Sequence, residues 1–196
     1  INLGGICCTA TEILMRHGIP VAGNFLQKEL VIITGAVDLM VVDIQCILPG
    51  IIDVAKCFHT EVVTTSEKAQ FKGATYVEFK HGDALATAKK IVEMAIERYK
   101  NRDPLKVSIP KETQDFIAGF TAENIFQFLG GRYRATYRPL NNAIMEGRIR
   151  GVAAIVGCNH PGLTQDMFHI TITRELLRHD ILVVETGCSA TACAKW

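Results

Sequence analysis

The sequence lacks the short motifs by which several enzyme classes are recognised. It has no C-x2-C pair, no G-x-G-x-x-G or G-x-x-x-x-G-K-[ST] loop and no G-x-S-x-G elbow. These absences argue against a compact zinc knuckle, a dinucleotide or P-loop site of the common kind, and an α/β-hydrolase nucleophile.

The sequence also lacks a charge bias and a long apolar run. Its 196 residues carry 21 basic and 20 acidic side chains, for a net charge of +1. This balance gives no electrostatic basis for binding nucleic acid or an anionic membrane. The longest apolar runs fall far short of the roughly 20 residues that a membrane-spanning helix needs. We therefore expect no nucleic-acid partner and no membrane span.

The N-terminus has neither an initiator Met nor the basic region of a secretory signal. The chain starts within a strand-like run and stops within a helical pattern. We therefore expect an internal fragment of a longer, cytoplasmic protein.

Strand-like and helix-like segments alternate along the chain, which is typical of an α/β fold with parallel, Rossmann-like layers. Residues 83–99 have the clearest helical spacing of apolar positions, and residues 112–120 and 122–129 are also predicted to be helical. Residues 101–111 hold two prolines and several basic side chains, so we place a boundary there. The expected organisation is parts of two consecutive α/β domains, residues 1–100 and 112–196, joined by this boundary segment.

Seven cysteines are many for a chain of this size, and their odd number fits a disulfide scaffold poorly. Four of them come just after apolar, strand-like runs, at residues 1–6, 39–44, 152–156 and 181–184. These four are Cys8, Cys46, Cys158 and Cys188. The carboxyl ends of parallel strands meet at one edge of a sheet, where ligands bind. Four thiols brought there could hold an iron–sulfur cluster.

The other three cysteines are interpreted as packing residues. Cys7 should point away from Cys8, and so from the point where the four thiols meet, if the chain is extended there. Cys57 lies in a helical stretch, where a buried cysteine is more common than a metal ligand. Cys193 lies about one and a half helical turns after Cys188 and does not share its face.

Two histidines come near the expected edge. His160 follows Cys158 closely and could donate a hydrogen bond to a sulfur or move protons, although a solvated loop histidine is the more common alternative. The same applies to His59. The remaining four are interpreted as surface or helix-end residues: His17, His81, His169 and His179.

Long stretches of the chain resemble the catalytic subunit of anaerobic nickel-containing carbon monoxide dehydrogenases. The matching stretches include GICCTATEILMRHGIP, VVDIQCILP, AKCFHTEVVTTSEKA, FTAENIFQFLGG, GRIRGVAAIVGCNHPG and ETGCSATACAKW. The resemblance covers essentially the whole chain. It implies about a third of such a subunit, from the second half of its middle α/β domain into the last domain.

The resemblance implies a Ni-Fe-S cluster that oxidises CO with water to CO2, reversibly. Carried over by motif, Cys8 would bind the iron outside the cubane, and Cys46, Cys158 and Cys188 would bind the cubane irons. The family's acid–base residues and its further 4Fe-4S clusters would lie outside this chain, so the catalytic residues remain unknown, with His160 a weak candidate. The resemblance also implies a ferredoxin-type electron acceptor and a homodimer of the full-length parent.

Two alternatives remain open. One is the related hybrid-cluster protein, a hydroxylamine reductase; it has a Glu-His pair where this chain has Ile44-Gln45 before Cys46. The other is a non-catalytic, metal-binding relative on the same fold.

Overall fold

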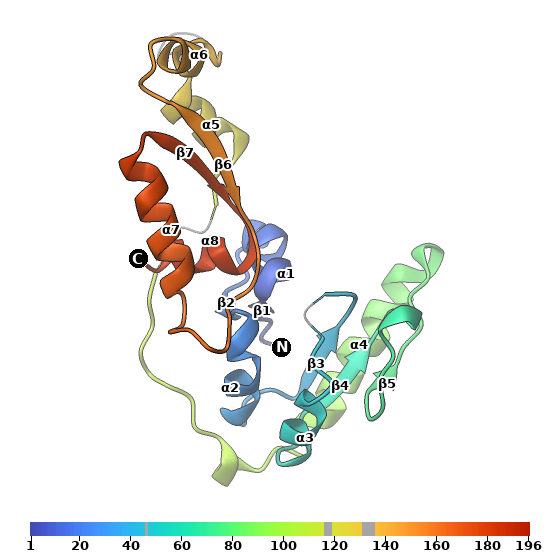
Figure 1. The fold of residues 1–196 in the computed structure, drawn as a ribbon. Helices are drawn as coiled ribbons and strands as arrows, with labels where there is room; N and C mark the ends of the chain where they lie inside the picture. Colours follow the sequence, from blue (N-terminus) through green and yellow to red (C-terminus); the bar gives the residue numbers. More distant parts are fainter. Residues whose placement is uncertain (46, 116–118, 131–135) are drawn as a thin grey trace. The chain divides into compact units, whose positions relative to one another are not determined.

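A computed structural model describes residues 1–45, 47–115, 119–130 and 136–196 (Figure 1). Cys46 therefore lies outside the described residues. The chain divides into two compact units. Unit 1 comprises Ile1–Asn2 and Gln27–Thr113, and unit 2 comprises Leu3–Leu26 and Gln114–Trp196.

Unit 1 is built on a parallel sheet of three strands in the order β3-β4-β5. The strands are β3 (Leu39–Val42), β4 (Glu61–Thr64) and β5 (Thr75–Tyr76), and the helices are α2 (Lys28–Ile33), α3 (Ile51–Lys56) and α4 (Ala84–Tyr99). Apolar side chains of the strands and of α2 and α3 form the core; they include Ile32, Met40, Ile51, Val62 and Val63. The β-branched run in β4 explains this placement, because such residues suit a strand covered on both faces.

Unit 2 contains two parallel strand pairs, β1 (Gly5–Ile6) with β2 (Val21–Gly23), and β6 (Gly151–Ile155) with β7 (Ile181–Glu185). Its helices are α1 (Cys7–Glu12), α5 (Ala122–Leu129), α6 (Arg138–Met145), α7 (Met167–Arg178) and α8 (Gly187–Ala194). Helix α7 packs along β6 and β7, and α1 packs against α8 (Figure 1). The carboxyl ends of β1, β6 and β7 thus each lead into a segment that carries a cysteine.

Short 3-10 turns connect several of these elements, at Leu14–His17, Phe25–Gln27, Glu67–Ala69, His81–Asp83 and Pro104–Lys106. Among the described residues, no helix combines the length and the apolar character required to cross a membrane.

The predicted α/β fold with parallel strands is confirmed, and α4 and α5 match the helices expected at residues 83–99 and 122–129. The helix expected at residues 112–120 is wrong, since the described residues 112–115 and 119–120 are not helical. Residues 3–26 belong to unit 2 rather than to a continuous first part, because α1 packs on α8. The assignment of residues 1–100 and 112–196 to two domains of a longer parent stays a prediction.

Candidate metal centre

Three of the four cysteines that follow strands lie in unit 2. Cys8 is the second residue of α1, directly after β1. Cys158 lies in the loop after β6, and Cys188 is the second residue of α8, just after β7. These are positions at the carboxyl ends of parallel strands, where α/β proteins bind ligands. The fourth, Cys46, comes after β3 in the sequence and lies outside the described residues.

The Cys188 sulfur is a buried hydrogen-bond acceptor in unit 2. Its side chain is buried, with 1% of the residue exposed, and it accepts a hydrogen bond from the Phe25 backbone N–H at 3.3 Å. The hydrogen bond from the Cys7 thiol, with those from Phe25 and Cys158, outweighs burial and lowers the pKa of Cys188 to about 6. Donors aimed at a sulfur favour its charged form, which is why this pKa lies below that of an ordinary thiol.

The Cys8 sulfur lies against the backbone directly before Cys188. A Cβ atom added at Gly187 would come within 2.8 Å of Cys8 Sγ. Gly187 also has a φ of 65°, which disfavours any side chain. Glycine at this position therefore allows the Cys8 sulfur to approach the start of α8.

The orientation predicted for Cys7 is wrong. Cys7 is buried and its thiol hydrogen-bonds to Cys188 instead of pointing away from that group. The prediction assumed the side-chain alternation of an extended chain, but Cys7 begins α1 with a left-handed φ of 58°. The alternation rule does not hold in that conformation.

Cys193 packs elsewhere, as the sequence predicted. Its thiol donates to Thr173 Oγ1 at 3.6 Å and Glu185 Oε1 at 3.4 Å, on the side of α8 that meets α7 and β7. Burial, with the Glu185 carboxylate nearby, raises the pKa of Cys193 to about 11. The packing expected for Cys57 is wrong, because this residue is exposed at the end of α3.

The histidines differ from their expected positions in two cases. His59 precedes β4 and hydrogen-bonds through Nε2 to Asp38 Oδ1 at 2.9 Å, directly before β3, so it lies at the amino ends of these strands and not at the carboxyl edge. His169 is buried in α7 rather than on the surface. His160 is exposed, and its Nδ1 accepts the Gly162 N–H at 3.0 Å within its own loop.

The donor set fits a cluster with sulfur ligands. Thiolates are soft donors that suit iron–sulfur clusters, and backbone N–H groups to sulfur are part of how proteins tune them. Within the described ranges, no group of three or more His, Cys, Asp or Glu side chains is already arranged to hold a metal ion. The six described cysteines form no disulfide.

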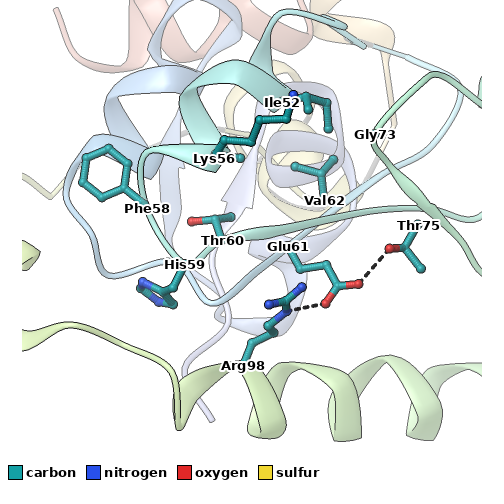
Figure 2. Close-up of a pocket in the computed structure, with 11 residues that line it drawn as sticks. Ile52, Lys56, Phe58, His59, Thr60, Glu61, Val62, Gly73, Thr75 and Arg98 are labelled. Carbon is teal, nitrogen blue, oxygen red and sulfur yellow. Dashed lines mark hydrogen bonds and ion pairs between the residues drawn. The ribbon is translucent and has the colours of Figure 1, made fainter.

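Unit 1 contains a separate pocket of about 270 Å³ beside β4 (Figure 2). Glu61, Arg98 and Thr75 are among the polar residues that line it. Glu61 pairs with Arg98 Nε at 2.5 Å and accepts a hydrogen bond from Thr75 Oγ1 at 2.8 Å. Burial opposes ionisation of Glu61, but Arg98 and Thr75 more than offset it and lower the pKa of this carboxyl group. Because these polar groups satisfy one another, we interpret them as a structural ion pair.

The comparisons with known proteins agree with this chemistry. The family model described as Prismane/CO dehydrogenase matches residues 1–196. The chain belongs to this family. A carbon monoxide dehydrogenase of Methanosarcina acetivorans is 49% identical over 195 residues, which is 100% of this chain and 30% of that protein.

Solved structures of carbon monoxide dehydrogenases are also similar to this chain. Carbon monoxide dehydrogenase IV of Carboxydothermus hydrogenoformans matches with a TM-score of 0.85 and 49% identity, over 100% of this chain and 31% of that one. An acetyl-CoA synthase/carbon monoxide dehydrogenase, described with NiZn[Fe4S4] and NiNi[Fe4S4] clusters in its alpha subunits, matches with a TM-score of 0.85 and 44% identity, over 100% of this chain and 29% of that one. The resemblance stated from the sequence is confirmed, and the chain spans about 30% of the length of these relatives.

Sequence reasoning missed three groups around Cys188: the Cys7 thiol, the Phe25 N–H and the buried Asp166. The adjacency of Cys7 to Cys8 was the one visible signal. No sequence pattern indicates which backbone N–H will face a distant sulfur.

Proposed function

We propose that the longer protein containing this chain is a carbon monoxide dehydrogenase. The reaction is CO + H2O → CO2 + 2 H⁺ + 2 e⁻, and it is reversible. The observation that carries the proposal is the 49% identity to carbon monoxide dehydrogenases across the whole chain. The thiols and N–H donor gathered at Cys188 support it independently.

The residues proposed to hold a Ni-Fe-S cluster are Cys8, Cys46, Cys158 and Cys188. When bound, such a cluster supplies the metal site for CO and water and takes up the two electrons. This chain supplies the sulfur ligands and their surroundings. The lowered pKa of Cys188 keeps its sulfur deprotonated, as a metal ligand must be. Cys7 donates to that sulfur and is proposed to support it rather than to bind iron.

The direct test is anaerobic CO oxidation by the full-length protein, followed by reduction of a viologen dye. We expect CO-dependent reduction together with nickel, iron and acid-labile sulfide in the purified protein. A protein with its metals but no CO-dependent reduction would contradict the proposed activity.

The same preparation distinguishes the alternatives. Hydroxylamine-dependent oxidation of reduced dye, without CO oxidation, would support the alternative that the protein is a hybrid-cluster protein. Bound metal without either reaction would support a non-catalytic relative. The 49% identical carbon monoxide dehydrogenase favours CO oxidation.

We further propose a ferredoxin-type electron acceptor, a homodimer of the full-length parent with additional 4Fe-4S clusters outside this chain, and a cytoplasmic location. Reduced thiols in such numbers suit a reducing compartment. CO-dependent ferredoxin reduction and light scattering of the native protein test the acceptor and the dimer. His160 stays a weak candidate for proton transfer, since the acid–base residues are unknown.

A further inference from the structure

Four side-chain donors meet at the buried carboxylate of Asp166 in unit 2. Oδ1 of Asp166 accepts from Asn24 Nδ2 at 3.1 Å, from Asn159 Nδ2 at 3.1 Å and from Gln165 Nε2 at 2.9 Å. The Lys195 ammonium pairs with Oδ2. Asp166 is 8% exposed and Asn24 is fully buried. A buried carboxylate needs such donors, and here they come from three segments of the chain: residue 24, the loop of residues 159–165, and residue 195.

The backbone of Asp166 is also fixed in an unusual conformation. Its φ is 66°, in the left-handed region, and its N–H donates to Asn159 Oδ1 at 2.7 Å. Asp166 and Asn159 therefore exchange two hydrogen bonds. A non-glycine residue persists in this region when its surroundings hold it there.

Three of the four side-chain partners of Asp166 are attached to a group at the Cys188 sulfur. Asn24 directly precedes Phe25, whose N–H donates to Cys188 Sγ. Asn159 directly follows Cys158, whose thiol hydrogen-bonds to Cys188. Lys195 directly follows α8 as its C-cap, and Cys188 is the second residue of that helix.

We propose that Asp166 is a positioning residue for the thiol ligands. Its carboxylate bonds to Asn24 beside the Phe25 turn, to Asn159 in the loop that carries Cys158, and to Lys195 after the helix that carries Cys188. The sulfurs of Cys158 and Cys188 are thereby held in place before any metal arrives. The identity of the metal cluster rests on the proposed function. The role of Asp166 in arranging the thiols rests on the hydrogen bonds described above.

The test is Asp166→Asn in the full-length protein. Asn tolerates the left-handed conformation, yet it replaces a charged acceptor by an amide that faces four donors. The matched control is Glu61→Gln in unit 1 (Figure 2), where a carboxylate of similar side-chain exposure, 16% against 11%, also pairs with a cation. Melting curves of both variants establish that they fold.

The first readout is the alkylation rate of Cys188 in metal-free protein, relative to Cys193 in the same chain. Cys193 hydrogen-bonds to Thr173 and Glu185 rather than to Cys188. The Asp166 carboxylate raises the pKa of both thiols, so loss of its charge alone, or general loosening of α8, would speed the alkylation of both. We expect Asp166→Asn to raise this ratio about tenfold and Glu61→Gln to leave it unchanged. The second readout is iron affinity, which we expect Asp166→Asn to lower by about 10- to 100-fold, as for other residues that orient ligands.

An unchanged alkylation ratio in folded Asp166→Asn, or equal acceleration of Cys193, would overturn the inference. If Asp166→Asn does not fold, Asn24→Ala removes the hydrogen bond that joins the Phe25 turn to Asp166, together with the Asn24 Oδ1 that accepts from Gln165 Nε2 at 2.7 Å. This variant must raise the same ratio, and no rise in the folded variant would overturn the inference equally. A parent that binds iron without oxidising CO contradicts the proposed function and leaves both readouts valid. A parent that binds no iron also contradicts that function, and the alkylation ratio still decides the role of Asp166.

Discussion

Cys188 and Cys193 are five residues apart on one helix, but their surroundings shift their pKa values in opposite directions. Hydrogen bonds led by that from Cys7 lower the pKa of Cys188 to about 6, whereas burial raises that of Cys193 to about 11. Of these two thiols, Cys188 is the one whose surroundings favour the charged form that a metal ligand needs near neutral pH.

The first prediction concerns the titration of these thiols in metal-free protein. The thiolate absorbance lost in Cys188→Ala should correspond to a group that ionises near pH 6. Cys193→Ala should remove absorbance only near pH 11. Because the pKa of Cys188 is depressed on folding, its contribution to stability is present above its ordinary pKa and is lost as the pH falls through about 6. An ordinary thiol titration near pH 8.5 for Cys188 would contradict the hydrogen-bond arrangement.

The adjacent pair Cys7 and Cys8 gives the second prediction. Cys8→Ala should reduce the iron content of the full-length protein, because it removes a proposed ligand. Cys7→Ala should retain iron but raise the pKa of Cys188 in the metal-free protein, because it removes a donor to that sulfur. Equal loss of iron in both variants, measured by elemental analysis, would mean that Cys7 is also needed for binding.

At the scale of secondary-structure elements, α7 carries an unusual buried side chain. His169 is 2% exposed, and both of its ring nitrogens lack a hydrogen-bond partner among the described residues. An unsatisfied buried polar group costs about 1–3 kcal/mol. Its ring packs edge-on against Phe168.

The third prediction is that His169→Leu is neutral or raises the free energy of unfolding by about 1 kcal/mol, since it removes this unsatisfied group. The control is His179→Leu at the end of the same helix, where an exposed pair with Glu175 contributes little. Urea unfolding midpoints of the full-length protein provide the measurement. A clear destabilisation by His169→Leu would show that the imidazole has a partner in the folded protein.

The elements themselves could be predicted well where one periodic pattern runs uninterrupted. The apolar spacing of α4 and the β-branched runs of β6 and β7 indicate their type and approximate bounds. The strand-end positions of Cys8, Cys158 and Cys188 followed from the same patterns. The direction of the Cys7 side chain could not be predicted. Cys7 has a left-handed backbone conformation where β1 meets α1, and the pattern of apolar residues does not indicate such a conformation. The hydrogen bonds and ion pair of Asp166 could not be predicted either, because its partners Asn24 and Lys195 are far from it in the sequence.

For the whole molecule, unit 2 is discontinuous in the sequence. Residues 3–26 join residues 114–196, and Thr186 Oγ1 donates to Glu12 Oε1 at 2.6 Å between the two segments. Sequence patterns describe neighbours along the chain, so they could not show that residues 3–26 pack with residues 114–196.

The fourth prediction is that these segments open together. Under mild denaturant, amide hydrogen exchange of the full-length protein should give residues 3–26 the same opening free energy as α8, because they belong to one cooperative unit. Strands β3 and β4 serve as the comparison within unit 1. Exchange of residues 3–26 that follows β3 and β4 instead would contradict the division into units.

The central claim is that thiols placed after parallel strands bind the metal cluster. It is tested most directly by the iron content of Cys188→Ala and Cys193→Ala, two identical substitutions on helix α8 of the full-length protein. With folding verified by melting curves, we predict that Cys188→Ala loses most of its cluster iron and that Cys193→Ala keeps the parent's content. Equal iron in the two variants would contradict the account.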